Sequence, residues 1–320
     1  MPIAAQLARF GSATEAVRLV EQTDPDDPGP AEILVRMQLA PINQADLLMI
    51  TGGYGFRSDL PCALGAEGVG IVVQAGTASG FAKGDQVIPL VRGCWAQILR
   101  LPADAVLRVP PGLSLAQAAT LRINPATARR LLNLVALKSG DWIMQNGAGG
   151  SLGRLVAAFS ARAGLNCLSV VRRRNNLMPI PGEIIIEDST ILSDDIKPLT
   201  KGAPIRLALD CVAGEASGRM ASCLEPGGTL VVFGHLSGAP CSIPSTLLTS
   251  RGLTVRGFSL RPTESGATQG HLNDFYHHLA ADIGDLHPNI AATYKLRDLH
   301  AALDHAARPG RGGKIMLDFT

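Results

Sequence analysis

Short apolar runs, broken repeatedly by Pro and Gly, occupy the first third of the chain. They lie at Ile33–Met37, Gly70–Gln74, Gln86–Pro89 and Trp95–Leu101. Runs of this length between turn residues are typical of β-strands rather than of helices. The pattern up to about Leu121 therefore predicts an irregular, mostly antiparallel β domain.

From Asn124 onward the pattern changes to an alternation of helix and strand. Amphipathic stretches predict helices at Ala126–Leu137, Leu152–Ala163 and Ser217–Leu224. Apolar runs between them predict strands at Trp142–Gln145, Asn166–Val171, Glu183–Ile186, Arg206–Val212, Thr229–Phe233 and Leu253–Gly257. This alternation is typical of a doubly wound parallel sheet, so we expect an α/β fold of the Rossmann type.

The last segment predicts two more helices, Leu272–Asp282 and Leu296–Ala307, and a strand at Lys314–Phe319. We expect this tail to rejoin the N-terminal domain and to leave a cleft between two domains. The predicted boundaries are 1–122 with 265–320 for the β-rich domain, and 123–264 for the Rossmann domain.

A glycine-rich turn joins the strand at Trp142–Gln145 to the helix that follows. In a βαβ unit such a turn places backbone amides and a helix N-terminus against a pyrophosphate. Ala148 stands where the first glycine of the usual fingerprint would be, but Gly150 and Gly153 remain. A plain turn is an equally good interpretation of the loop alone. With its flanks, the loop predicts cofactor contacts at Gly150, Ser151, Leu152 and Gly153.

Three consecutive arginines, Arg172, Arg173 and Arg174, end the second strand of this unit. NAD-binding chains need an acidic residue there for the ribose hydroxyls, and the next acidic residue is Glu183. Guanidinium groups match a phosphate dianion, so the position predicts NADPH rather than NADH. The competing interpretation is a solvated basic loop.

Composition sets limits on the partners of the protein. A chain of 320 residues with 46% hydrophobic and 18% charged residues and a net charge of +2 is typical of a soluble globular protein. It gives no reason to expect nucleic acid or a membrane. The six cysteines are scattered, and folded-looking sequence begins within a few residues of the N-terminus. We therefore expect a cytoplasmic protein.

Four blocks of residues carry a family resemblance. They are Pro41–Asp46 with Thr51–Gly55, Gly65–Gly70, Ile123–Ala128 and Arg256–Leu260. With the domain order, they resemble the medium-chain dehydrogenase/reductase superfamily, and within it the mitochondrial-type 2-enoyl thioester reductases. The resemblance implies a GroES-like catalytic domain, a Rossmann domain and a dimer.

Zinc-using members of this superfamily are similar to one another in a Cys near the Asn43 position and a His in a Gly-His-Glu motif. Here Asn43 and Ala66 stand at those places, and neither provides a zinc ligand of that type. We therefore expect no metal, and another group must stabilise the charge that develops on the substrate.

The resemblance places the catalytic tyrosine of the family on Tyr54. Hydride addition to an α,β-unsaturated thioester forms an enolate, which needs a proton at the α-carbon, and a phenol is protonated at neutral pH. The alternative is an ordinary turn tyrosine packed against its loop. By the same resemblance Asn43 orients Tyr54 or the nicotinamide ribose, and Asp46 is a structural acceptor.

Further cofactor contacts are implied by resemblance, each with an alternative. Asn124 could instead cap the following helix. The apolar Phe233, Phe258 and Leu260 could be core. His235, next to Gly234, could be polar surface, and Lys314 a surface lysine that opens a strand. We predict cofactor contacts at all seven positions, which are Asn124, Phe233, Gly234, His235, Phe258, Leu260 and Lys314.

Three functions remain open. The first is NADPH-dependent reduction of a 2-enoyl thioester of CoA or acyl carrier protein. The second is a zinc-independent NADPH:quinone oxidoreductase, and the third a non-catalytic NADPH-binding protein. We also expect a homodimer, because the apolar strand at Leu253–Gly257 would pair across a two-fold axis if it lies at a sheet edge.

Overall fold

The computed structural model describes residues 1–55, 59–175, 179–182, 184–260 and 266–320. The chain forms two compact units. Unit 1 contains Met1–Ile123 and Ala267–Thr320, and unit 2 contains Asn124–Gly266. Two predictions fall outside the described residues. They are Glu183, the first residue of the strand predicted at Glu183–Ile186, and the domain boundary predicted between residues 264 and 265.

Unit 1 contains two sheets that are mostly antiparallel. Seven strands form the larger sheet, in the order β15-β16-β3-β5-β6-β8 with β7 also paired to β3, and three form a sheet in the order β2-β1-β4. The strands are β1 Ile3–Leu7, β2 Val17–Glu21, β3 Glu32–Ile42, β4 Cys62–Ala63, β5 Val69–Ala75, β6 Gln86–Pro89, β7 Ile98–Pro102, β8 Val106–Arg108, β15 Ile290–Lys295 and β16 Lys314–Asp318. The predicted antiparallel β domain is confirmed, and the tail returns to it through β16.

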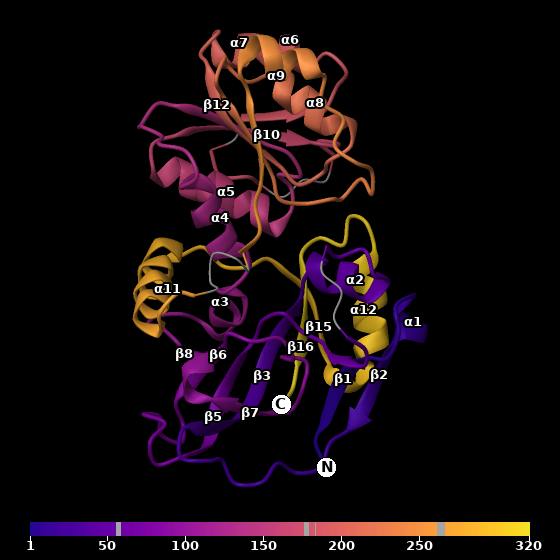
Figure 1. Cartoon of the computed structure of the whole chain (residues 1–320), viewed down its shortest axis with the longest axis vertical. Coiled ribbons are helices and arrows are strands. Elements are labelled where there is room, and N and C mark those ends of the chain that lie inside the picture. The colour runs from indigo at the N-terminus through magenta and orange to yellow at the C-terminus, as the bar shows by residue number, and fades with distance from the viewer. Residues whose placement is uncertain (56–58, 176–178, 183, 261–265) are drawn as a thin grey trace. The chain divides into compact units, whose positions relative to one another are not determined.

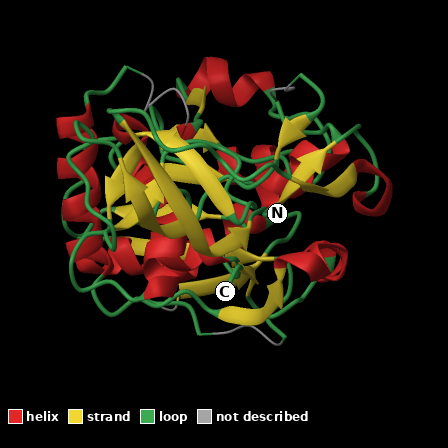
Figure 2. Cartoon of the chain, turned by 90° about the horizontal axis from the view of Figure 1, so that it is seen from below, coloured by secondary structure: helices red, strands yellow, loops and turns green. Residues whose placement is uncertain are grey.

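The helices of unit 1 are α1 Ala13–Ala16, α2 Gln44–Thr51, α3 Leu115–Thr120, α11 Gln269–Ile283 and α12 Leu299–Ala307, with 3₁₀ turns at Ala103–Ala105 and Leu296–Asp298. Of these, α11 lies on one side of the sheets and α1, α2 and α12 lie on the other (Figure 1), and Figure 2 shows helices and strands of the whole chain by colour. The predicted strand at Trp95–Leu101 begins three residues too early. The Trp95 carbonyl accepts from Ala5 of β1, and its amide donates to Leu64, so the backbone at Trp95 is not paired to β3. Its indole is fully buried.

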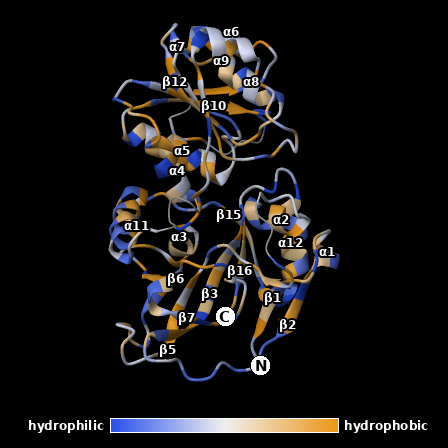
Figure 3. Cartoon of the chain, in the orientation of Figure 1, coloured by the Kyte–Doolittle hydropathy of each residue, from blue (hydrophilic) through white to orange (hydrophobic). Residues whose placement is uncertain are grey.

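Unit 2 is a six-stranded parallel sheet in the order β11-β10-β9-β12-β13-β14. Its strands are β9 Trp142–Gln145, β10 Asn166–Val171, β11 Ile184–Glu187, β12 Ile205–Asp210, β13 Thr229–Val232 and β14 Thr254–Gly257. The predicted doubly wound sheet is confirmed, and β9 and β10 have the predicted ends. Both β10 and β12 are coloured as hydrophobic in Figure 3, as strands covered on both faces require.

Helices cover both faces of this sheet. They are α4 Asn124–Leu132, α5 Ser151–Arg162, α6 Leu192–Asp195, α7 Lys197–Thr200, α8 Glu215–Ser222 and α9 Ser245–Arg251. Helices α4 and α5 lie on one face, and α6 to α9 lie on the other (Figure 1). The helix predicted at Ala126–Leu137 begins at Asn124 and ends at Leu132 instead. After Leu132 the amides of Asn133 and Leu134 bond three residues back, and this tightening ends the helix.

The two edge strands of unit 2 differ in exposure. Every residue of β14, which ends the sheet, is exposed, including Val255 at 39%. The apolar strand predicted at Leu253–Gly257 is therefore an edge strand.

No helix in the described part of the chain is both long enough and apolar enough to cross a bilayer.

Candidate functional site

A buried polar cluster in unit 1 forms where the last strand meets the third. The antiparallel pairing of β16 with β3 sets Ile315 opposite Ile42, so Lys314 and Asn43 are the next pair in register. The Lys314 ammonium donates to Oδ1 of Asn43. Lys314 is 5% exposed, so the alternative of a surface lysine is wrong.

Glu67 completes the cluster. Its Oε1 accepts from Nδ2 of Asn43 at 2.9 Å and lies 3.9 Å from Nζ of Lys314. Two glycines allow this approach. A Cβ on Gly65 would lie 2.6 Å from the Trp95 nitrogen, and one on Gly68 would lie 2.7 Å from Cε of Met37. The two glycines of the Gly-Ala-Glu-Gly block therefore let the backbone pack closely against its neighbours, and this places the Glu67 carboxylate in the cluster.

Asp46 lies in the same region and has the structural role that the sequence analysis gave it. Its Oδ2 accepts from the Asn43 amide at 2.9 Å, at the start of α2. This closes the first turn of the helix, because first-turn amides have no acceptor within the helix.

Burial controls the ionisation of the three charged groups in the cluster. It raises the pKa of Asp46 and of Glu67, and it lowers the pKa of Lys314. In each case loss of hydration is the largest cause, and the opposite charges nearby oppose it. The cluster is thus an ion pair kept in apolar surroundings, where each charge depends on its partner.

Tyr54 lies on the loop that leaves α2. Gly52 ends the helix in the left-handed conformation, and the Tyr54 amide then donates to the Leu48 carbonyl at 3.1 Å. The Arg92 guanidinium stands over the Tyr54 ring, 5.4 Å from its centroid. Nη1 of Arg92 lies 3.6 Å from Oδ1 of Asp46, so the buried carboxylate holds the cation against the phenol.

In unit 2 the glycine-rich loop is a tight turn that leads directly into α5. Gly147 has φ +61°, and Gly150 is the N-cap of α5. A Cβ on Gly153 would lie 2.6 Å from Cα of Ala148, so only glycine lets the helix approach the turn this closely. The amides of Ser151, Leu152 and Gly153 lie in the first turn, where helices leave N–H groups for an anion.

The three arginines after β10 are exposed, but they are not equivalent. The Arg174 amide donates to Oε1 of Glu187 at 2.7 Å, and its guanidinium donates to the Ile185 carbonyl. Arg174 is therefore used in part to attach the loop to β11. Arg172 and Arg173 have no hydrogen bond or ion pair with any residue that the structure describes.

The other predicted contacts of unit 2 gather at the same edge of the sheet. Phe233, Gly234 and His235 follow β13, and Phe258 and Leu260 follow β14. The Phe233 amide donates to the Asp210 carbonyl at 2.9 Å, and a Cβ on Gly234 would lie 2.5 Å from the Cys211 carbonyl oxygen. Since carboxyl ends of parallel strands share an edge, these loops lie at the same edge of the sheet as the glycine-rich turn.

Asn124 is the first residue of α4 rather than a cap placed before the helix. The expected start at Ala126 is therefore wrong, and the residue lies at the beginning of the helix that packs against α5.

Sequence reasoning missed a second polar pair, Asn146 and Asp210, both buried. Nδ2 of Asn146 donates to Oδ1 of Asp210 at 2.6 Å. The same carboxylate accepts from the amides of Val212 and Ala213 and from the Ser217 hydroxyl. The pair holds the turn that begins the glycine-rich loop.

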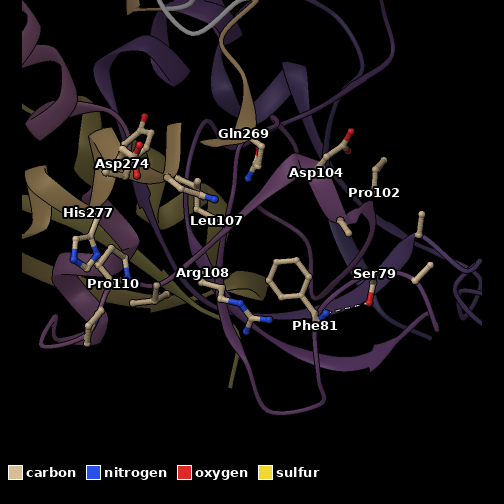
Figure 4. Close-up of a pocket in the computed structure, with 17 residues that line it drawn as sticks. Ser79, Phe81, Pro102, Asp104, Leu107, Arg108, Pro110, Gln269, Asp274 and His277 are labelled. Atoms are coloured by element: carbon tan, nitrogen blue, oxygen red, sulfur yellow. Dashed lines mark hydrogen bonds between the residues drawn. The ribbon is translucent and has the colours of Figure 1, made fainter. Parts of the chain in front are cut away.

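A cavity of about 880 Å³ in unit 1 lies apart from these residues. Figure 4 shows Arg108 beside Phe81, where the guanidinium stands 4.4 Å from the ring centroid, with Asp104, Asp274 and His277 also on its walls. None of the predicted site residues lines it. Within the described residues, no cluster of three His, Cys, Asp or Glu side chains could hold a metal ion.

Comparisons with known proteins place this geometry in a family. The Alcohol dehydrogenase GroES-like domain family matches residues 29–111. The mitochondrial enoyl-[acyl-carrier-protein] reductase of Homo sapiens is 32% identical over 301 residues, which are 90% of this chain and 81% of the relative. The protein of the same name from Caenorhabditis elegans is 33% identical over 307 residues, 93% of this chain and 89% of the relative. The chain belongs to the medium-chain dehydrogenase/reductase superfamily, in the family of the mitochondrial-type enoyl-[acyl-carrier-protein] reductases.

A solved structure from Bacillus thuringiensis has the same fold over nearly the whole chain. It is assigned by name to the NADPH:quinone reductases, and it matches with a TM-score of 0.90 at 28% identity, covering 99% of this chain and 98% of its own. The predicted two-domain fold and the superfamily are thus confirmed.

In unit 1, Glu67 and Arg92 are site residues that sequence reasoning did not single out. Glu67 had a signal, because it is a lone acidic residue between glycines in the apolar stretch Leu64–Val72. Arg92 had none, because its position over Tyr54 depends on the fold of two distant loops.

Proposed function

We propose that the protein is an NADPH-dependent reductase of 2-enoyl thioesters, carried by CoA or by acyl carrier protein. The observation that carries this proposal is Tyr54 under the Arg92 guanidinium, beside the buried cluster of unit 1. The relatives at 32% and 33% identity that are named enoyl-[acyl-carrier-protein] reductases support it.

The residues of unit 2 fit NADPH. The close contact of Gly153 with Ala148 leaves the turn bare of side chains, which suits a pyrophosphate at the N-terminus of α5. Arg172 and Arg173 are exposed at the end of β10, where a 2′-phosphate would require cations. When bound, the cofactor would supply the hydride for the β-carbon of the substrate.

The residues of unit 1 would then handle the charge and the proton. Hydride addition leaves an enolate on the thioester, and we propose that the Tyr54 hydroxyl donates the proton to its α-carbon. The phenolate left behind is negative, and the Arg92 guanidinium 5.4 Å from the ring stabilises it. The Asp46 carboxylate prevents Arg92 from moving away, since removal would leave a buried charge alone.

NADPH oxidation with crotonyl-CoA, longer 2-enoyl-CoAs and a simple quinone tests this function. We expect enoyl thioesters to be reduced with a much higher kcat/KM than quinone. Tyr54→Phe should lower kcat about a hundredfold, the range of lost acid catalysis, with NADPH affinity unchanged. Tyr294→Phe is the matched control. The Tyr294 hydroxyl forms a hydrogen bond of 2.9 Å with His305, outside the buried cluster, so this variant should keep the wild-type kcat.

One other enzymatic function has support of its own. The Bacillus thuringiensis structure, named for quinone reduction, favours an NADPH:quinone oxidoreductase. Quinone turnover without thioester turnover would establish this alternative. Tight NADPH binding with neither activity would instead establish a non-catalytic protein.

We also propose that the protein is a homodimer. The edge strand β14 is exposed along its whole length, and among the described residues only β13 pairs with it, on one side. Pairing of two β14 strands across a two-fold axis would satisfy the backbone groups of the other side and join two parallel sheets into one.

A further inference from the structure

We propose that Glu67 and Lys314 are positioning residues, which hold the side-chain amide of Asn43 in one of its two possible orientations. The inference rests on the proposed function for its catalytic consequence. It assigns Lys314 a different role from the cofactor contact that the family resemblance implied.

The two ends of an amide have opposite hydrogen-bonding properties, and the cluster distinguishes them. Nδ2 of Asn43 faces the Glu67 carboxylate at 2.9 Å, and Oδ1 faces the Lys314 ammonium. A flipped amide would put its oxygen against the carboxylate and its NH₂ against the ammonium. Both contacts would then be repulsive, so the ion pair fixes the amide by charge as well as by shape.

This arrangement leaves one defined group for a bound molecule, the second Nδ2 hydrogen of the amide. Oδ1 faces the Lys314 ammonium and, in the capping box of α2, the Asp46 backbone amide. Asn43 is only 5% exposed and cannot be turned by solvent. The ammonium of Lys314 is directed toward Asn43, with Glu67 3.9 Å away, so its charge is used inside the protein.

Glu67 also fixes the backbone at which the chain leaves unit 1. Its Oε2 accepts from the Ile123 amide at 2.8 Å, and Ile123 is the last residue of the unit before Asn124. Nη1 of Arg122 donates to the carbonyls of Ala66 and Val91 at 2.9 and 3.1 Å. One carboxylate therefore sets both the Asn43 amide and the start of the crossing to unit 2.

The test uses Glu67→Gln, Lys314→Met and the double variant in the full-length protein. Each single change leaves a buried charge without its partner, so both should lower the melting temperature. The double variant removes both charges and should regain most of the loss in melting temperature. Its kcat should nevertheless stay about tenfold or more below wild type, because the amide is no longer held in one orientation.

Two outcomes overturn the inference. If kcat recovers together with the melting temperature in the double variant, the ion pair is merely structural. If Lys314→Met raises the NADPH Kd more than about tenfold while the kcat at saturating NADPH is kept, Lys314 contacts the cofactor instead.

A readout without turnover separates this inference from the proposed function. The signals of the Asn43 side-chain NH₂ in ¹H–¹⁵N spectra can be assigned with an Asn43→Ala variant. In the wild type these hydrogens should exchange slowly with water. In Lys314→Met they should exchange at least about tenfold faster. If the wild type shows slow exchange but no enoyl reduction, the proposed function is wrong and the positioning role stands. If the exchange rates of the wild type and Lys314→Met are equal, the positioning role is wrong, whatever the activity.

Discussion

Asn146 donates to Asp210 across 2.6 Å and so joins the carboxyl ends of the adjacent strands β9 and β12. Oδ1 of Asn146 accepts from the Cys211 amide at 2.8 Å in return. Asn146 thus binds both the Asp210 carboxylate and the backbone that follows β12, while Asp210 also accepts from two backbone amides in its own turn. The pair therefore fixes the backbone just before Gly147, where the glycine-rich turn begins.

Asp210→Asn should destabilise the protein and weaken the cofactor site. The change replaces an acceptor of four hydrogen bonds by an amide that accepts at one atom only, and we expect a loss of about 2 kcal/mol in the free energy of unfolding. NADPH affinity should fall as well, because the turn loses its support. Thermal unfolding and NADPH fluorescence titration measure the two effects. Ser217→Ala removes one bond on the side of α8 and should lower stability alone; an equal loss of affinity there would contradict the prediction.

Gly153→Ala and Gly150→Ala form a matched pair within one motif. The new Cβ at position 153 would lie 2.6 Å from Cα of Ala148, whereas the one at position 150 meets only the Gly147 carbonyl oxygen at 3.4 Å. We expect overpacking at 153 to cost about 1–3 kcal/mol and to raise the NADPH Kd, and the change at 150 to do much less of both. The prediction fails if the two variants bind NADPH equally well.

The arginines after β10 should set the preference for NADPH over NADH. Arg172→Ala with Arg173→Ala should lower NADPH affinity about tenfold to a hundredfold, the range of lost charge-assisted bonds to phosphate, and leave NADH affinity unchanged. Arg174→Ala should cost less, because its guanidinium is bonded to the Ile185 carbonyl. Titrations of both cofactors measure the ratio. Equal losses for NADPH and NADH would mean that these residues do not recognise the 2′-phosphate.

Asp85 should contribute to acid sensitivity. The Ala82 amide donates to it at 2.8 Å, and this bond, followed by the Arg108 guanidinium, lowers its pKa below the ordinary value. A group whose pKa is lower in the folded state stabilises the protein above the unfolded pKa, about 4, and loses this contribution as the pH falls through its folded value. In thermal unfolding, Asp85→Asn should therefore be less stable than wild type at pH 7, with a gap that narrows toward pH 3. Asp24→Asn, at an exposed position, removes the same charge and should show no such narrowing.

Val255→Lys should test the proposed dimer through β14. A lysine on an exposed edge strand opposes pairing with a second strand, because its charge would be buried in the joined sheet. We expect the wild type to elute as a dimer in size-exclusion chromatography with light scattering, and the variant to shift toward the monomer. A wild type that is monomeric at all accessible concentrations would exclude the dimer.

Sequence patterns predicted best the elements that depend on local signals. The ends of β9 and β10 follow from continuous apolar runs bounded by Gly and charged residues, such as Asn166–Val171 before Arg172. The helix expected at Ala126–Leu137 was too long at its end, since the apolar residues continue beyond Leu132 while the backbone turns. Hydrophobicity alone does not record a backbone change of this kind.

The site was predictable in its residue types and only partly in its connections. The glycine-rich loop and Arg172 could be placed because strand and helix positions fix them. The partners of Lys314 could not, because Lys314 and Asn43 are 271 residues apart and their pairing depends on the register of β16 against β3. Whether a charge such as Glu67 is buried or exposed is decided by packing, which no local pattern contains.

The discontinuous make-up of unit 1 has a consequence for the order of events during synthesis. Unit 2 is one continuous stretch of chain, whereas unit 1 consists of two stretches that unit 2 interrupts. A ribosome therefore completes the parallel sheet before it reaches β16. Until that strand emerges, β3 lacks a neighbour and Glu67 lacks the cation that compensates it. In the nascent chain, unit 2 can therefore fold first, and the polar cluster of unit 1 forms last.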